Sequence, residues 1–420
     1  MAIARVVRLA ALALFLIGHG EGWAQSGRVR AVVTAGEPAP GGGTFEHFSI
    51  ESLPIIVPIN SRGEVAFFAT LLRGPAGEGI FLTSAGRIVK VAVEGDAVPG
   101  GGTLSGFGRH PIPTLNEMGT VAFAAAVTGG KTVEGIFSVS RGRLRMVASA
   151  GAPAPGFPSG TLANLDLPSL NDHGDIAFAA TVRRGRETLE AIYLHAGGRL
   201  QKVAGQGDAA PAGGTFAAFG APALNNRGMV AFGAIVEGRA VPGGIFIAAG
   251  GQVKMVLGAG EITPLGGIFT KFSERLAFND AGTVAFHAQM KDARARSAIV
   301  MRAGGQTRSV AALGDPAPGG GVFSNFGLWP ALAADDTVGF TASVDGGPSA
   351  VGVFTSGRHG TSRLAGVGDA APGGGTFVTL TLYPAVEISP GGGTVAFAAA
   401  PSATGEGVEG LYLAERQPAP

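Results

Sequence analysis

Cysteine is absent from all 420 residues, which excludes disulfide bonds and a lipid anchor attached to a cysteine. An excess of charge of one sign is also lacking, since 31 basic and 30 acidic residues give a formal net charge of +1. Such a balance creates no long-range field, so the sequence predicts no binding to nucleic acid. Gly-x-Ser-x-Gly and His-Glu-x-x-His catalytic patterns are missing too. The sequence therefore predicts no catalytic residue, no metal site and no cofactor.

Long apolar runs are missing except at the start of the chain. Arg5 and Arg8 precede an apolar core over 9–17, and small residues follow at a cleavage site. A membrane anchor is the alternative, but a run of this length is too short to cross a bilayer comfortably. We therefore predict a signal peptide over 1–24 and export to the periplasm or the cell exterior. The mature domain, 25–420, is predicted to have no membrane span.

Glycine and proline are abundant, at 72 and 26 residues, while 46% of the residues are hydrophobic. This combination argues against disorder and is typical of an all-β protein with many tight turns. The phrase Val-Ala-Phe or a close variant recurs, with its aromatic residue at Phe67, Phe123, Phe178, Phe232, Phe286, Phe340 and Phe397. The spacing of 54–57 residues indicates seven tandem repeats.

The fourth copy illustrates the internal order of the repeat. A short segment over 221–224 leads into 225–228, Asn-Asn-Arg-Gly, where we expect a hairpin turn because asparagine and glycine tolerate positive φ. Apolar patterns over 229–236, 244–247 and 253–257 predict three further strands, the last two joined by a Gly-Gly turn. Each repeat is thus predicted to form four antiparallel strands followed by a Gly- and Pro-rich crossing to the next repeat.

Four strands and a long final crossing are typical of a β-propeller blade. A β-helix has much shorter rungs, and separate domains of this size could not each bury a core. The mature chain begins with the equivalent of a fourth strand over 28–33 and ends with the equivalent of a third strand over 410–413. We therefore predict a seven-bladed propeller in which the N-terminal strand completes the last blade and closes the ring.

The turn and the strand after it read Asn-x-x-Gly-x-x-Ala-Phe in five copies, which begin at Asn60, Asn116, Asn171, Asn225 and Asn279. This pattern resembles the tandem NxxGxxxAF-repeat family of exported bacterial proteins, and the match covers nearly the whole mature chain. The sixth copy has Ala333 at the asparagine position and the seventh has Pro390, which predicts altered turns rather than another fold. The resemblance implies propeller-like repeats and no particular chemistry.

The crossings begin with glycine and an acidic residue in six places, at Glu37, Asp96, Asp208, Glu261, Asp315 and Asp369. The favoured interpretation is a turn in which each carboxylate accepts nearby backbone N–H groups. The alternative is a ring of carboxylates that collects a hard cation such as Ca²⁺, although ligands spread around a ring would lie far apart.

Residues that break the repeat are the better candidates for function, because repeated positions mostly serve the scaffold. If the first strand of each blade is innermost, the crossings and the loops after the second strand share one face, and loops on a rigid scaffold often bind ligands. There we predict ligand-binding residues at Trp329, Tyr383, His110, Arg109, His47, Asp166 and Arg275. The alternative for Trp329 and Tyr383 is packing beneath their own loops.

These features favour an exported, non-catalytic binding or scaffold protein that recognises a peptide, protein or glycan on the crossing-loop face, with no indication of oligomeric state. The first alternative is a carbohydrate lyase or hydrolase with its site at the central tunnel mouth. The second is a purely structural extracellular repeat protein. Unlike polar side chains at the tunnel mouth would favour a catalytic or small-molecule site, whereas Ala, Gly and Val would favour a scaffold.

Overall fold

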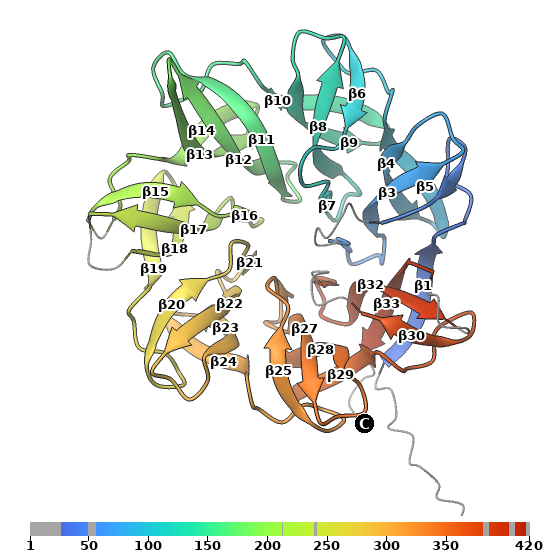
Figure 1. Cartoon of the computed structure of the whole chain (residues 1–420). Helices are drawn as coiled ribbons and strands as arrows, with labels where there is room; N and C mark the ends of the chain where they lie inside the picture. The colour runs from blue at the N-terminus through green and yellow to red at the C-terminus, as the bar shows by residue number, and fades with distance from the viewer. Residues whose placement is uncertain are drawn as a thin grey trace, which may run out of the picture.

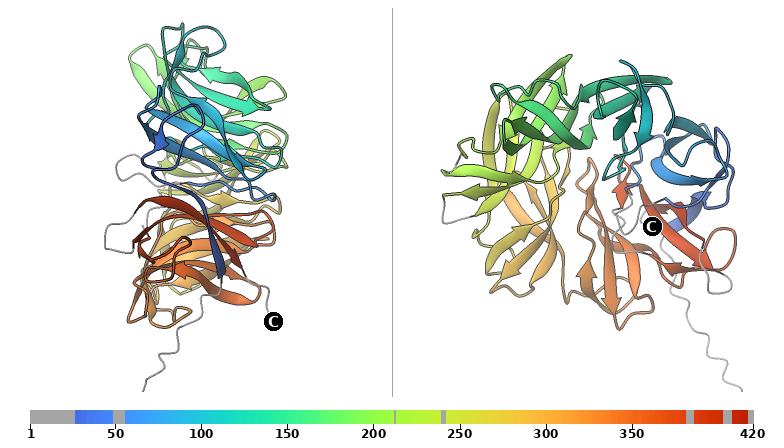
Figure 2. Two further views of the ribbon diagram at one scale, coloured as in Figure 1. Left: turned by 90° about the vertical axis from the view of Figure 1, so that its right-hand side faces the viewer. Right: turned by 45° about the horizontal axis from the view of Figure 1, so that its top comes forward.

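The computed structural model describes residues 27–48, 56–211, 213–238, 242–380, 386–402 and 408–416. Within these residues all regular secondary structure is β, arranged as seven sheets around a central axis (Figure 1). Seen edge-on, the ring is a disc much wider than it is thick (Figure 2). The predicted seven-bladed propeller is confirmed, whereas the predicted signal peptide over 1–24 lies outside the described residues.

The first three blades follow one another in chain order. Blade 1 contains β2 (Thr44–Phe45), β3 (Ala66–Leu72), β4 (Glu78–Ser84) and β5 (Arg87–Val93). Blade 2 contains β6 (Thr103–Gly106), β7 (Thr114–Leu115), β8 (Val121–Thr128), β9 (Glu134–Ser140) and β10 (Arg143–Ser149). Blade 3 contains β11 (Thr161–Leu170), β12 (Ile176–Arg184), β13 (Glu187–Ala196) and β14 (Arg199–Gly205).

The next three blades repeat this order. Blade 4 contains β15 (Thr215–Phe219), β16 (Ala223–Leu224), β17 (Val230–Glu237), β18 (Gly243–Ala249) and β19 (Gln252–Gly258). Blade 5 contains β20 (Ile268–Phe272), β21 (Ala277–Phe278), β22 (Val284–Lys291), β23 (Ser297–Ala303) and β24 (Gln306–Ala312). Blade 6 contains β25 (Val322–Phe326), β26 (Ala331–Leu332), β27 (Val338–Asp345), β28 (Val351–Gly357) and β29 (Gly360–Gly366).

Blade 7 joins the two ends of the chain. It contains β30 (Thr376–Thr379), β31 (Glu387–Ile388), β32 (Thr394–Ser402), β33 (Gly410–Arg416) and, from the N-terminal end, β1 (Gly27–Thr34). Strand β1 pairs with β33 in antiparallel register, so its backbone groups complete the fourth strand of the sheet (Figure 1). The predicted closure of the ring by the N-terminal strand is therefore confirmed.

The innermost strand differs from the short segment expected from the sequence. In blade 4 it comprises two halves, β15 and β16, which both pair with β17 and are separated by residues 220–222. The second halves β7, β16 and β21 surround the centre of the ring (Figure 1). The interruption turns a few backbone groups and side chains away from the ladder, and it therefore places non-repeating residues along the central channel.

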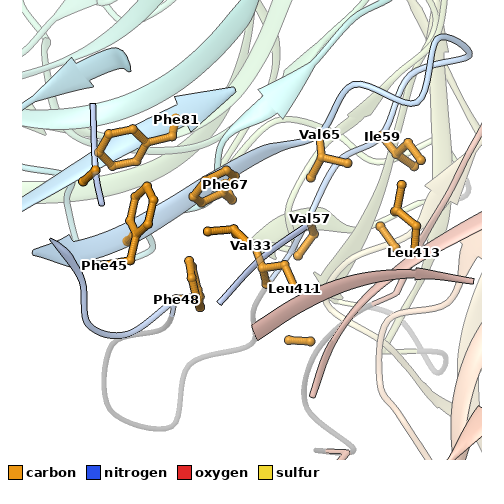
Figure 3. Close-up of a cluster of buried hydrophobic side chains, with 14 of the residues drawn as sticks. Val33, Phe45, Phe48, Val57, Ile59, Val65, Phe67, Phe81, Leu411 and Leu413 are labelled. Atoms are coloured by element: carbon orange, nitrogen blue, oxygen red, sulfur yellow. The ribbon is translucent and has the colours of Figure 1, made fainter. Parts of the chain in front are cut away.

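The repeated phenylalanine forms the core of each blade together with an aromatic or aliphatic partner on the next strand. Phe232 and Phe246 stack with their ring centroids 5.7 Å apart, and Phe67 and Phe81 do the same at the same distance. Where the ring closes, Leu411 and Leu413 of blade 7 join Phe67 in one buried cluster (Figure 3). Hydrophobic burial is therefore continuous from the last blade to the first.

The turn asparagine links each blade to the next one. In blade 4 the Asn225 Oδ1 accepts the N–H groups of Arg227 and Met229, at 3.1 and 3.0 Å. Its Nδ2 donates to the carbonyl oxygen of Asn279, the equivalent residue of blade 5, at 3.0 Å. Asn60, Asn116, Asn171 and Asn279 make equivalent bonds to the following blade at 2.9–3.4 Å.

The asparagine is not required for positive φ, in contrast to the expectation from the sequence. Gly228 has the positive φ that the turn requires, at 70°, but Asn225 is not among the residues with positive φ. Asparagine suits the position because its amide offers an acceptor for its own turn and a donor for the neighbouring blade.

In the last two turns, side chains other than asparagine accept the N–H groups of the turn. Ala333 replaces the asparagine in blade 6, and the neighbouring Asp335 accepts the Thr337 N–H at 3.0 Å. In blade 7 the turn position is occupied by Ser389, whose hydroxyl accepts the Thr394 N–H at 3.1 Å. The assignment of Pro390 to this position was wrong, because the last turn is one residue longer than the others.

Substitution of the turn asparagine should destabilise the ring. In Asn225→Ala three hydrogen bonds of a buried side chain are lost, and we expect a loss of about 1–3 kcal/mol in the free energy of unfolding. Asn225→Asp keeps the acceptor and loses the donor, so it should also be destabilised. Urea unfolding followed by circular dichroism measures both. The exposed neighbour Arg227→Ala is the control, with an expected change within about 0.5 kcal/mol. Wild-type stability of both Asn225 variants would contradict the proposed linkage.

Candidate functional site

Residues four positions before the turn position meet across the centre of the ring. We call them the channel layer; for blades 1 to 6 they are Ile56, Ile112, Leu167, Ala221, Arg275 and Trp329. Ile56 and Ile112 are 3% and 6% exposed, and Leu167 and Trp329 pack against them. Contacts among blades 1, 2, 3 and 6 are possible only across the channel. The layer is therefore aliphatic on one side and carries an arginine and a tryptophan on the other.

The arginine of the channel layer is held by two partners. Arg275 Nη2 donates to Glu387 Oε1 of blade 7 at 3.1 Å, so the pair spans blade 6. The guanidinium carbon lies 6.0 Å from the centre of the Trp329 ring, within cation–π range. The second terminal nitrogen, Nη1, is buried and has no hydrogen-bond partner among the residues that the structure describes. Arg275 thus retains a donor for an additional acceptor.

A second charged pair connects blades 2 and 3. His110 Nδ1 lies 2.5 Å from Asp166 Oδ2, and both side chains are partly buried. His110 lies two residues before Ile112, and Asp166 lies directly before Leu167. The pair therefore lies beside the channel layer, on the side of the crossings, because the innermost strand runs from the crossing toward the turn. The hydrogen bond to Asp166 raises the pKa of His110; Glu274 also raises it, while burial and Arg109 lower it.

Glu274 connects this charged pair with the arginine site. Its charge acts on His110 of blade 2, although Glu274 is adjacent to Arg275 in blade 5. Burial raises the pKa of Glu387, and Arg275 opposes that shift. Acidic and basic groups of blades 2, 3, 5 and 7 thus form two pairs, His110–Asp166 and Arg275–Glu387, beside the channel layer. This arrangement can bind a ligand that offers hydroxyl groups, which both donate and accept.

Two pockets flank the segment 271–274 of the innermost strand in blade 5. The larger, of about 510 Å³, lies between blades 4 and 5 and is lined by Phe219, Gly233 and Phe272 among others. The smaller, of about 120 Å³, lies between blades 5 and 6 and includes His287 and Trp329. His287 Nε2 lies 2.6 Å from the Ser297 hydroxyl, and burial together with Lys271 lowers the pKa of His287 to about 4. His287 is therefore neutral at physiological pH.

The acidic residues of the crossings form turns. Asp208 Oδ2 accepts the Gly205 N–H at 2.8 Å, and the other five carboxylates accept the N–H three residues earlier at 2.7–2.9 Å. Four of them also pair with a basic side chain, as Asp208 does with Lys202 at 2.7 Å. These bonds agree with the turn interpretation. Among the described residues no group of three potential ligands is placed to hold a metal ion.

The family model of a family of unknown function, DUF7453, matches residues 22–190, 184–298 and 278–418. These matches overlap and extend through all seven blades. The chain belongs to this family. The repeat organisation inferred from the sequence is thus shared with the family, while its description specifies no chemistry. No curated protein matches the chain.

Solved structures show likeness of fold. An oligogalacturonate lyase in complex with manganese is 12% identical, with a TM-score of 0.51, over 93% of this chain and 98% of the other. A puromycin-hydrolysing peptidase of Mycobacterium tuberculosis is 13% identical, with a TM-score of 0.49, over 91% of this chain and 56% of the other. At these identities the likeness extends to the propeller fold alone. Among the described residues of this member of DUF7453, no helix is long and apolar enough to cross a membrane.

The structure brings four of the predicted residues together in pairs, His110 with Asp166 and Arg275 with Trp329. Trp329 packs against Ile56 and Ile112 of blades 1 and 2. Arg109 is exposed beside His110, and His47 is an exposed residue that lies 3.4 Å from Glu409 at the junction of blades 7 and 1.

Tyr383 lies outside the described residues. Glu274 and Glu387 were not predicted as site residues. In the observed register the equivalents of Glu387 in blades 1 to 6 are Pro58, Thr114, Ser169, Ala223, Ala277 and Ala331. The sequence register, with Pro390 at the turn, places Ile388 there, so aligning the copies does not identify Glu387.

The His110–Asp166 pair should be visible in the titration of the histidine. We expect His110 to titrate above its ordinary value of 6.5, and Asp166→Asn should lower its pKa. Because the folded-state pKa is raised, the pair stabilises the fold fully below pH 6.5 and less as the pH rises through the raised pKa. NMR titration of the imidazole protons measures this, with His110→Gln to assign the signal. An unchanged His110 pKa in Asp166→Asn would contradict the pairing.

Proposed function

We propose that this protein is an exported, non-catalytic binding propeller that holds a segment of a glycan at the crossing-loop side of its channel. The observation that carries the proposal is the Arg275–Glu387 pair beside Trp329, with the His110–Asp166 pair next to Ile112 and Leu167 of the same channel layer. Export rests on the segment over 1–24, whose pattern is that of a signal peptide.

A glycan suits this combination of groups better than a purely apolar ligand. Sugar hydroxyls donate and accept, and they can therefore use the carboxylates, the imidazole and the Nη1 of Arg275, which has no partner among the described residues. The indole ring of Trp329 offers a flat apolar surface to the C–H face of a sugar ring. The channel layer below these groups is aliphatic in blades 1 to 3, which excludes water from one side of the bound segment.

Intrinsic fluorescence tests this proposal directly. The sequence has two tryptophans, and Trp329 is the only one after removal of 1–24. We expect oligosaccharides from a glycan panel to change the emission of Trp329, and calorimetry to give at least about tenfold weaker binding for Arg275→Ala, which removes a partly buried charged hydrogen-bond donor. Trp329→Ala should weaken binding similarly.

His47→Ala is the matched control and should bind as the wild type does, because His47 pairs with Glu409 away from the channel layer. Glycan binding that survives both Arg275→Ala and Trp329→Ala would place the ligand elsewhere and contradict the proposed site.

A lyase or hydrolase is the second candidate, and the His110–Asp166 pair favours it. A histidine with a raised pKa keeps its proton to a higher pH than an ordinary histidine, and it can donate that proton to a leaving glycosidic oxygen. Under this alternative, a polysaccharide panel should yield new reducing or unsaturated ends. His110→Gln should reduce the turnover by about a hundredfold or more. Binding without any turnover by the wild type would exclude this candidate.

A further inference from the structure

We call the junction between neighbouring blades the seam. Two positions in each blade face the seam that this blade forms with the next blade. The first is the residue after the repeated phenylalanine, namely Phe68, Ala124, Ala179, Gly233, His287, Thr341 and Ala398 in blades 1 to 7. The second lies three residues before the core side chain of the third strand, at Glu78, Glu134, Glu190, Gly243, Ser297, Val351 and Glu409. Blade 4 is the one blade of the seven with glycine at both positions.

The seam between blades 1 and 2 shows how these side chains work. The Phe68 ring packs edge-on against Phe107 of blade 2, with 6.2 Å between the ring centroids. Glu78 Oε1 accepts the N–H of the same Phe107 at 2.8 Å. One aromatic ring and one carboxylate from blade 1 thus cover one residue of blade 2, and Phe107 is only 1% exposed.

The seam between blades 4 and 5 lacks both groups. Phe272 is the equivalent of Phe107, and its side chain remains partly exposed in the pocket of about 510 Å³. A Cβ atom added at Gly233 would have only the Ser273 carbonyl oxygen within 4 Å, at 3.8 Å, and Gly233 has no positive φ. The backbone therefore does not require glycine there, and the missing side chain leaves usable space.

The backbone N–H of the seam residue also needs a partner. Glu134, Glu190 and Glu409 accept the equivalent N–H groups of Leu165, Phe219 and Phe48. In blade 6, where Ser297 replaces the glutamate, Asn325 accepts the Phe326 N–H at 3.0 Å. In blade 5 the residue at the position of Asn325 is Lys271, which carries no acceptor, and Gly243 provides none either.

We propose that the seam between blades 4 and 5 is a binding site for a small aromatic carboxylate. The ring of the ligand occupies the place that Phe68 fills in blade 1 and packs against Phe272. Its carboxylate takes the role of Glu78 and accepts the Phe272 N–H. Lys271 lines the pocket and neutralises the carboxylate, while Glu274, which also lines it, can accept an ammonium group if the ligand is an aromatic amino acid.

Matched small molecules separate the two required groups. We expect 3-phenylpropionate and L-phenylalanine to bind in calorimetry or saturation-transfer NMR. Propionate lacks the ring and 3-phenylpropan-1-ol lacks the carboxylate, and each should bind at least about tenfold more weakly than 3-phenylpropionate. Tighter binding of L-phenylalanine would identify an amino acid as the natural type of ligand, and tighter binding of 3-phenylpropionate a simple aromatic acid. Equal binding of propionate and 3-phenylpropionate would overturn the proposal.

Substitutions locate the binding. Gly233→Phe places in blade 4 the side chain that blade 1 carries, and it should abolish binding while the thermal unfolding curve stays cooperative. Ile235→Thr removes an exposed apolar side chain that lines the pocket and should weaken binding several-fold; its control is Ile262→Thr, an 82% exposed isoleucine outside the pocket. If Gly233→Phe does not fold, the comparison of Ile235→Thr with Ile262→Thr tests the proposal. Wild-type binding by Ile235→Thr, or by a folded Gly233→Phe, would overturn the proposal.

The seam site and the glycan site can be tested separately, although Glu274 lies close to both. Trp329 and Arg275 do not line the pocket between blades 4 and 5, so Trp329→Ala and Arg275→Ala should retain 3-phenylpropionate binding. Loss of glycan binding with retention of the aromatic acid, or the reverse, shows which of the two proposals fails.

Discussion

The hydrogen bond from one turn amide to the carbonyl of the next blade is the interaction on which the ring depends. A four-stranded sheet of about 54 residues cannot bury both of its faces, and each blade is stable only against its neighbours. At five of the seven junctions the asparagine fixes the angle and height of the contact on the channel side, because its amide is buried and uses both of its polar atoms. Apolar packing alone would not specify this register, since it is not directional.

Fixing the repeat in this way leaves other positions free to differ. Asn225 and its four asparagine equivalents bond to the next blade, and the phenylalanine at 232 and its equivalents fill the core. Positions four residues before the turn face only the channel, and they hold aliphatic residues in three blades and Arg275 and Trp329 in two others. Seam positions vary similarly, from Phe68 to Gly233. Function can therefore change at these positions while the ring persists.

Most of the fold could be predicted from the sequence, because repeat period, strand alternation and the positions of the termini are all local or periodic signals. The true register of the last turn could not be predicted, because Pro390 matches the spacing of the repeat whereas Ser389 makes the hydrogen bonds. The site was predicted only in part. Residues that break the repeat included His110 and Arg275, but the partner of Arg275 is 112 positions away and no local pattern indicates it.

The charged pairs in the channel are costly for a structural role. Three blades complete the channel layer with isoleucine or leucine, and burial of such side chains stabilises the ring without desolvating a charge. A partly buried ion pair such as Arg275–Glu387 has to offset that desolvation, and apolar residues of similar volume are often at least as stabilising. The buried Nη1 atom without a partner among the described residues adds to the cost. Stability alone therefore does not account for these side chains, and the glycan that we propose as ligand would supply an acceptor to Nη1.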